Sequence, residues 1–149
     1  MKRSLRIFLD TSVIFAAVLS ESGGARVLFK LGEAGALQLI VGSSVFRESE
    51  QVVRRKAPAS LPKLAYLLES GMVEIATRPS DEFFEQARAM VVYEPDAYVL
   101  AEAMAAEPDW FITHDKAHFL NTNLDSRLTI RIGTPGDLIQ ALEDEFTHN

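Results

Sequence analysis

Two acidic residues follow segments that have the composition of buried strands. Asp10 directly follows the apolar residues 5–9, and Asp115 comes two residues after the segment 110–113. In a parallel sheet the carboxyl ends of the strands meet at one edge, where such sheets bind ligands. If both segments belong to one parallel sheet, the two carboxylates lie at that edge. Each aspartate by itself has a second interpretation, as a turn former or a helix cap.

Two further acids are expected on helices. Asp96 stands at the start of one helix, where the helix dipole favours an anion, so simple capping is the alternative to a chemical role. Glu48 lies inside another helix, between Phe46 and the valines at 52–53. Most glutamates in such places face solvent, and the spacing alone does not turn Glu48 inward.

Taken together, these acids have the chemistry of a divalent cation site. Clustered carboxylates repel one another, and their pKa values rise until a cation neutralises the group. Oxygen ligands suit Mg²⁺ or Mn²⁺, and the absence of cysteine excludes thiolate metal sites and a cysteine nucleophile. Four oxygen ligands at Asp10, Glu48, Asp96 and Asp115 would suit Mg²⁺ or Mn²⁺, but their spacing alone does not bring them together in one site.

The elements that must position these acids follow from apolar segments that alternate with helical ones. The expected strands are residues 5–9, 37–41, 72–76, 110–113 and 128–132. The expected helices are residues 13–19, 25–33, 45–55, 60–71, 81–90, 95–106 and 134–142. This alternation predicts an α/β fold with a mostly parallel sheet covered by helices on both faces, a three-layer α/β/α architecture. We expect a single domain over residues 1–149, with its core at about 5–142.

Composition narrows the class of protein. The chain has 149 residues and 48% hydrophobic residues, which is typical of a globular domain. The longest apolar stretch, residues 7–19, is interrupted by the polar residues 10–12, so no membrane span and no membrane partner are expected. With no cysteine, the chain suits a reducing compartment, and we expect a cytoplasmic protein.

Charge bears on nucleic-acid binding in two ways. Lys and Arg number 15 against 21 Asp and Glu, for a net charge of −6, which argues mildly against binding phosphates. Residues 1–63, however, hold 10 basic and 5 acidic residues. This surplus is either scattered over solvated helices or gathered on a basic face. The densest cluster, residues 54–56, either contacts RNA phosphates or forms the positively charged end of a solvated helix.

Four segments, in order, resemble motifs of the PIN-domain family, in particular the VapC-type toxins of type II toxin–antitoxin systems. They are residues 9–13 (LDTSV), 45–48 (VFRE), 96–103 (DAYVLAEA) and 111–116 (FITHDK). The resemblance runs from about residue 5 to 142. Each motif alone is common, and the specificity comes from their order and from the elements that carry them.

The resemblance implies a PIN-like fold and a metal-dependent endoribonuclease that hydrolyses RNA with Mg²⁺ or Mn²⁺. The acidic residues of the family fall here on Asp10, Glu48, Asp96 and Asp115, which the resemblance makes both catalytic residues and metal ligands. Of these, Asp10, Asp96 and Asp115 are the expected metal ligands. Glu48 completes the ligand set or holds a water.

Two hydroxyls match small polar positions of the same motifs. Ser12 and Thr113 are suited to orient a ligand or a water, as supporting residues. Many relatives carry a further acid soon after the last aspartate, where this chain has Ala117 and His118, so a complete second metal site is not implied. No histidine base is required, and we interpret His114 and His118 as neighbours of the site.

The resemblance also implies partners, namely an RNA substrate, an antitoxin protein and a second copy in a homodimer. Alternative functions are an RNA-processing nuclease without an antitoxin and a catalytically inactive PIN-like module that binds RNA or protein. A phosphatase that uses Asp10 as its nucleophile is disfavoured, because Ser12 stands where such enzymes carry a second acid.

Overall fold

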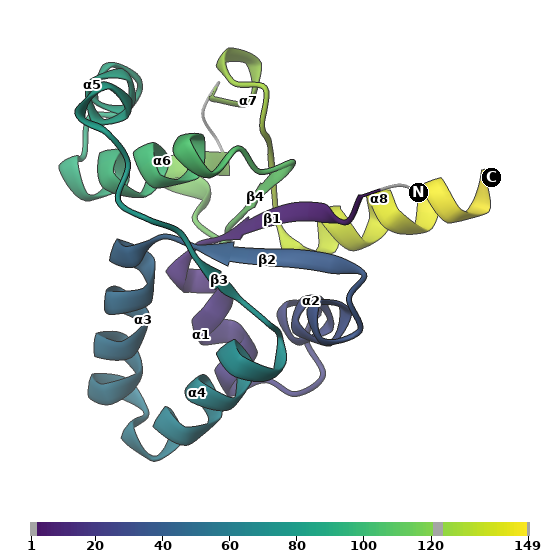
Figure 1. Ribbon diagram of the computed structural model, residues 1–149. Coiled ribbons are helices and arrows are strands. Elements are labelled where there is room, and N and C mark those ends of the chain that lie inside the picture. The colour runs from purple at the N-terminus through teal and green to yellow at the C-terminus, as the bar shows by residue number, and fades with distance from the viewer. Residues whose placement is uncertain (1–2, 121–123, 149) are drawn as a thin grey trace.

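Five short strands form one sheet with helices on both faces in the computed structural model, which describes residues 3–120 and 124–148 (Figure 1). The strands are β1 (Leu5–Leu9), β2 (Leu37–Val41), β3 (Glu74–Ile75), β4 (Trp110–Ile112) and β5 (Arg131–Gly133). The α-helices are α1 (Thr11–Leu19), α2 (Gly24–Glu33), α3 (Ser43–Lys56), α4 (Leu61–Ser70), α5 (Asp81–Met90), α6 (Glu94–Ala106), α7 (Leu124–Arg127) and α8 (Pro135–Thr147). A short 3₁₀ turn (Pro58–Ser60) precedes α4, and a π-helical turn (Lys116–Leu120) follows β4.

β1 lies at the centre of the sheet. The strand order is β3-β2-β1-β4-β5, and every neighbouring pair is parallel. Ile7, Phe8 and Leu9 are completely buried, because β1 has a strand on each side and helices over both faces. The register pairs Leu9 with Ile112 of β4, so the chain leaves these two strands side by side at one edge.

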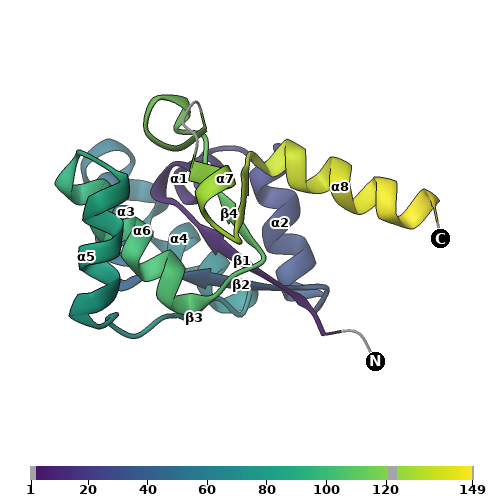
Figure 2. The same cartoon turned by 90° about the horizontal axis from the view of Figure 1, so that it is seen from above.

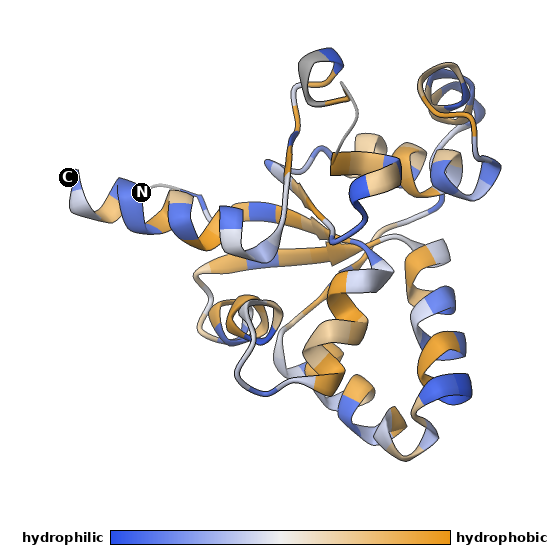
Figure 3. Cartoon of the chain, turned by 180° about the vertical axis from the view of Figure 1, so that it is seen from behind, coloured by the Kyte–Doolittle hydropathy of each residue, from blue (hydrophilic) through white to orange (hydrophobic). Residues whose placement is uncertain are grey.

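The helices form two layers. In Figure 1, α1 to α4 lie below the sheet, and α5 and α6 lie above it. α8 packs against α2 and along β4 and β5, and in Figure 2 it extends from the body on the side opposite α5. Hydrophobic residues predominate in β1, β2 and β4, whereas α3 and α8 carry many hydrophilic residues (Figure 3). The three-layer α/β/α prediction and the parallel sheet are confirmed.

The two edge strands differ from their expected bounds. β3 has only two residues, where residues 72–76 were expected, because only Glu74 and Ile75 pair with β2. β5 begins at Arg131, three residues later than expected, since its pairing with Trp110 sets its start. The short α7 was not expected. Edge strands are defined by their partners, and these pairings involve residues far away in the sequence.

No single helix in the described part of the chain is both long enough and apolar enough to cross a membrane. α1 and α2 pass such a test of length and composition only as a pair, and the chain bends by 93° between them.

Candidate active site

The carboxyl ends of β1 and β4 hold one predicted acid in place. The backbone N–H of Asp10 donates to the carbonyl of Ile112 at 3.0 Å, which joins the two strand ends. Asp10 also precedes α1, and its Oδ1 accepts the backbone N–H of Thr11 at 2.8 Å. The capping interpretation of Asp10 is therefore correct, and its second carboxylate oxygen serves a different set of contacts.

Two hydroxyls connect Asp10 with the segment that carries Asp115. The buried Thr113 Oγ1 donates to Asp10 Oδ2 at 2.8 Å and accepts the backbone N–H of Asp115 at 2.9 Å. Ser12 Oγ lies 3.4 Å from the same Asp10 oxygen and accepts the backbone N–H of His114 at 3.0 Å. Ser12 and Thr113, which the motifs singled out, thus fix Asp10 relative to the chain that follows β4.

All four predicted acids line one cavity of about 690 Å³ at this edge of the sheet. Asp10 and Asp115 reach it from the strand ends, Glu48 from the second turn of α3, and Asp96 from the first turn of α6. α6 begins two residues before Asp96, with no side-chain cap at its start, so Asp96 is not the helix cap. Glu48, which spacing alone left facing solvent, contributes to the cavity.

Burial and repulsion raise the pKa values of three of these acids. Asp10 is only 9% exposed, and loss of hydration raises the pKa of its carboxyl despite the hydrogen bonds that it accepts. Partial burial raises the pKa of Glu48, and the negative charge of Asp10 raises it further. Burial also raises the pKa of Asp96, although nearby His118 acts in the opposite direction. Carboxylates in such a group are stabilised by taking up a proton or a cation.

Thr11 contributes a buried hydroxyl to the same cavity. The residue is 6% exposed, and its Oγ1 makes no hydrogen bond to any of the described residues. The hydroxyl is close enough to Glu48 to lower that carboxyl's pKa, but the geometry of the pair falls short of a hydrogen bond. Burying a hydroxyl without a hydrogen-bond partner costs free energy.

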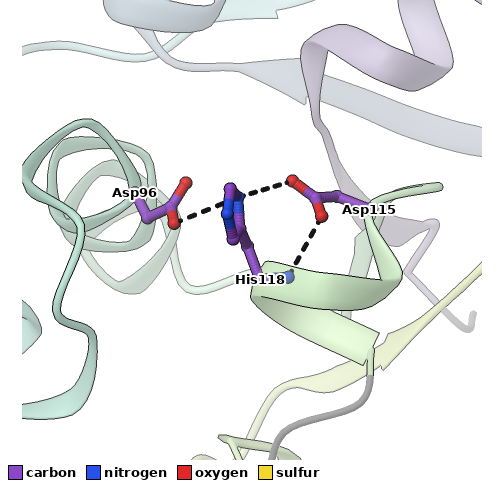
Figure 4. A group of neighbouring side chains, drawn as sticks. All are labelled: Asp96, Asp115 and His118. Carbon is purple, nitrogen blue, oxygen red and sulfur yellow. Dashed lines mark hydrogen bonds and ion pairs between the residues drawn. The ribbon is translucent and has the colours of Figure 1, made fainter.

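His118 stands between two of the acids (Figure 4). Its Nδ1 lies 2.9 Å from Asp115 Oδ2 and 3.3 Å from Asp96 Oδ2, and its backbone N–H donates to Asp115 Oδ1 at 3.0 Å. The next residue, Phe119, is buried and packs edge-on against a phenylalanine of β4, which anchors the π-helical turn. Sequence reasoning had set His118 aside as a neighbour, because the shape of this turn decides where the ring points.

Glu102 of α6 is a buried acid that sequence reasoning missed. It is 3% exposed, and its carboxylate accepts the Ser43 hydroxyl at 3.0 Å, the Ser44 backbone N–H at 3.0 Å and the Ser44 hydroxyl. A Cβ at Gly42 would lie 2.5 Å from Glu102 Cδ, so a glycine is needed for this close approach. Glu102 thereby joins the start of α3 to α6, the two helices that carry Glu48 and Asp96.

The three basic residues at 54–56 do not all lie on the same side of α3. Arg55 and Lys56 line the cavity, and the Lys56 ammonium lies 5.7 Å from the centre of the Phe15 ring. Arg54 instead pairs with Glu50 on the exposed side of α3, at 2.8 Å. Arg54 therefore lies on a solvated helix end, and contact of Arg55 and Lys56 with RNA phosphates stays a prediction.

The donor set fits a divalent cation. Four carboxylates and an unpartnered hydroxyl converge on one open cavity, and hard cations prefer oxygen ligands. Ligand atoms of Asp96, Asp115 and His118 all lie within 4.8 Å of one another. Two cationic side chains at the rim could contact an anionic polymer. This arrangement can bind a metal ion beside a phosphate group.

Solved structures share this fold. VapBC from Salmonella typhimurium, in a DNA-bound crystal structure, matches at 16% identity over 88% of this chain and 98% of that chain, with a TM-score of 0.66. VapBC2 from Rickettsia felis, bound to a DNA fragment from its promoter, matches at 13% identity over 86% and 97%, with a TM-score of 0.65. Mycobacterium tuberculosis VapC20, a Sarcin-Ricin loop cleaving toxin, matches at 18% identity over 74% and 91%, with a TM-score of 0.53.

A family model identifies the protein family of this chain. Comparison with curated protein sequences gave no significant match. The family model described as PIN domain matches residues 6–117, which include all four acids of the cavity. The chain therefore belongs to the PIN-domain family, as its ordered motifs predicted.

Proposed function

We propose that this PIN-domain protein is a metal-dependent endoribonuclease that hydrolyses RNA phosphodiester bonds, and that it acts as the toxin of a toxin–antitoxin pair. The observation that carries the proposal is the convergence of four acids on one cavity at the carboxyl edge of the sheet. Hydrolysis of a phosphodiester needs an activated water and stabilisation of negative charge. Carboxylates that hold a divalent cation supply both without a nucleophilic side chain.

The acids divide into roles by position. Asp10, Asp96 and Asp115 would hold Mg²⁺ or Mn²⁺, and Glu48 would complete the ligand set or hold the attacking water. A divalent ion bound there lowers the pKa of water and offsets the charge on the phosphate. In the metal-free chain, burial and the charge of Asp10 raise the pKa of Glu48, and a divalent cation bound beside it would favour its ionised form.

Other side chains orient the reacting groups. Ser12 and Thr113 hold Asp10 through hydrogen bonds, so its carboxylate needs little rearrangement when the site is loaded. Arg55 and Lys56 at the rim would bind phosphates that flank the scissile bond. The RNA would thus be held by its backbone beside the acids.

RNA cleavage by site variants tests the proposal. With Mg²⁺ or Mn²⁺, Asp10→Asn and Asp115→Asn should each lose more activity than the ~10–100-fold that removal of an outer-shell partner of a metal site costs. Asp81→Asn, an exposed change at the start of α5, is the matched control and should retain activity. Circular dichroism would verify that all three variants fold. Full activity in both site variants would overturn the metal-site assignment.

The toxin role is supported by the VapBC and VapC20 neighbours, and it implies an antitoxin partner. Induced expression should arrest growth, Asp10→Asn should abolish the arrest, and the product of a neighbouring small gene should relieve it. An RNA-processing nuclease would cleave RNA without a growth arrest that such a product relieves. An inactive binding module would bind RNA without cleaving it. Either result would exclude the toxin.

A homodimer is the remaining partner proposal. The apolar side chains of Phe8 and Leu28 are wholly buried, so they offer no surface to a second copy. Val27 and Leu31 of α2, with Phe146 of α8, instead line an apolar groove of about 330 Å³. This groove supports association, and light scattering of the purified chain would measure it. A monomeric mass at high protein concentration would contradict the homodimer.

A further inference from the structure

An imidazole nitrogen lies among carboxylate oxygens in the acid cavity (Figure 4). His118 Nδ1 is 2.9 Å from Asp115 Oδ2 and 3.3 Å from Asp96 Oδ2. Adjacent corners of an octahedron with metal–ligand bonds of about 2.1 Å are about 3.0 Å apart. The nitrogen therefore has nearly the spacing from each oxygen that two ligands of a common metal ion would have.

A second feature of the cavity points to a ligand independently of this cluster. Thr11 lines the same cavity, and its buried Oγ1 makes no hydrogen bond to the described residues. A hydrated cation in the cavity would supply one, because waters on the ion can hydrogen-bond to nearby hydroxyls.

We propose that His118 is a nitrogen ligand of the same ion that Asp96 and Asp115 hold, and that it makes the site prefer Mn²⁺ over Mg²⁺. The inference rests on the proposed function, because it concerns the metal ion of that site. Mg²⁺ strongly favours oxygen ligands and keeps much of its hydration shell, whereas first-row transition metals accept imidazole more readily. Replacing one oxygen ligand by imidazole therefore shifts the preference toward Mn²⁺.

The surroundings of His118 already orient its ring for this role. The backbone N–H of His118 binds the other oxygen of Asp115, and the Tyr93 ring lies 5.5 Å from the imidazole, centre to centre. Metal binding through Nδ1 places the ring proton on Nε2. The side chain is 45% exposed, so it can be replaced without opening the core.

Metal-binding measurements on the full chain test the proposal. Calorimetric titration with Mn²⁺ and with Mg²⁺ gives the ratio of the two affinities, and pulsed electron paramagnetic resonance of bound Mn²⁺ detects nitrogen coupling. The unchanged chain should prefer Mn²⁺ and show this coupling. His118→Gln should lose the coupling, and its Mn²⁺ affinity should fall by a larger factor than its Mg²⁺ affinity. His114→Gln, an exposed histidine four residues earlier, is the matched control and should keep both properties.

Different outcomes would overturn the role of His118 alone or the proposed nuclease function as well. Absence of nitrogen coupling in the unchanged chain, or an equal loss of both affinities in His118→Gln, overturns the assignment of His118. A rise in both affinities would show that the imidazole competes with the ion as a cation, which also overturns it. If Asp10→Asn still abolishes RNA cleavage, only the role of His118 falls. If the chain binds neither ion and Asp10→Asn cleaves normally, both proposals fall.

Discussion

The Thr113 hydroxyl has two roles that an apolar side chain of the same shape could not fill. It donates to a buried oxygen of Asp10 and accepts the backbone N–H of Asp115, so one atom connects the ends of the chain's two site-bearing strands. Thr113 is completely buried, and no water can replace these bonds without a change in packing. The geometry of the acids therefore depends on a residue that needs no contact with substrate.

Two substitutions of Thr113 distinguish the contribution of its hydroxyl from that of the shape of its side chain. Thr113→Val should lower the free energy of unfolding by about 1–3 kcal/mol, because Asp10 and the Asp115 N–H lose a buried partner. Thr113→Ser keeps the hydroxyl and should lose less, and urea unfolding measures both. If the valine variant is as stable as the unchanged chain, these hydrogen bonds contribute nothing to the fold.

The raised pKa of Asp10 predicts how its charge affects stability. The carboxyl keeps its proton to a higher pH in the folded chain than in the unfolded chain, where its pKa is about 3.9. Its favourable contribution is complete below that value and is lost as pH rises through the folded-state pKa. Asp10→Asn cannot ionise, so in metal-free buffer its stability relative to the unchanged chain should rise as the pH increases above about 4. Thermal unfolding across this range measures the difference, and a constant difference would contradict the prediction.

Divalent ions should restore the stability that the folded chain loses when Asp10 ionises. The proposed site would bind Mn²⁺ only in the folded chain, so Mn²⁺ should raise the melting temperature at neutral pH. The increase should be much smaller in Asp10→Asn, because the cluster loses a charged ligand. Thermal unfolding with and without millimolar Mn²⁺ measures it. No increase in the unchanged chain would count against a clustered metal site.

At the scale of elements, the relation between α3 and α6 depends on one buried carboxylate. Glu102 of α6 binds the first turn of α3, whose backbone N–H groups have no partner within the helix. α3 carries Glu48 and α6 carries Asp96, so this contact also sets the position of two acids of the cavity. Stability and site geometry are therefore connected through Glu102.

Shortening the Glu102 side chain should lower both the stability of the fold and the cleavage activity. Glu102→Ala leaves the Ser44 N–H and two hydroxyls without their acceptor, so the free energy of unfolding should fall by about 1–3 kcal/mol, and cleavage activity should fall with it. Glu102→Gln keeps one acceptor oxygen and should fall less. Urea unfolding and RNA cleavage, measured on the same samples, test the connection. An alanine variant with normal stability and activity would show that α3 is held by other contacts.

Elements differed in how well the sequence predicted them. β1, β2 and the residues of β4 were recognisable because buried strands need continuous apolar segments, and the acids at two of their ends followed from the parallel arrangement. β5 was misplaced because its start depends on the pairing with Trp110. The position of the His118 ring depends on a π-helical turn. The position of the Glu102 carboxylate depends on a glycine that lets α3 and α6 approach closely. Such features arise from tertiary packing and have no local pattern.

At the scale of the whole molecule, net charge and RNA binding need to be reconciled. The chain carries a net charge of −6, and four of its acids lie in one cavity, where a divalent cation would offset them. Arg55 and Lys56 lie at that cavity, whereas Arg54 pairs with Glu50 on the other side of the helix. The basic surface that we propose for RNA is therefore confined to the part of α3 that borders the cavity.

Paired charge variants test this local surface. In an Asp115→Asn background that limits cleavage, replacing Arg55 and Lys56 by alanine should weaken binding of single-stranded RNA. The salt dependence of the binding constant should fall by about 1.4 log units per log unit of salt, from two lost phosphate contacts. Arg54→Ala is the control and should change it little. Equal effects of both changes would indicate a diffuse electrostatic attraction.

The pairing of β1 with β4 also has a consequence for how the protein is made. Asp10 and Thr113, which bond to one another, are 103 positions apart in the sequence. Contacts between such distant segments form late, because the long intervening chain must first be ordered. A chain emerging from the ribosome therefore carries Asp10 and Glu48 well before it can assemble the acid cavity. Synthesis alone delays the appearance of the site until β4 has been added and has paired with β1.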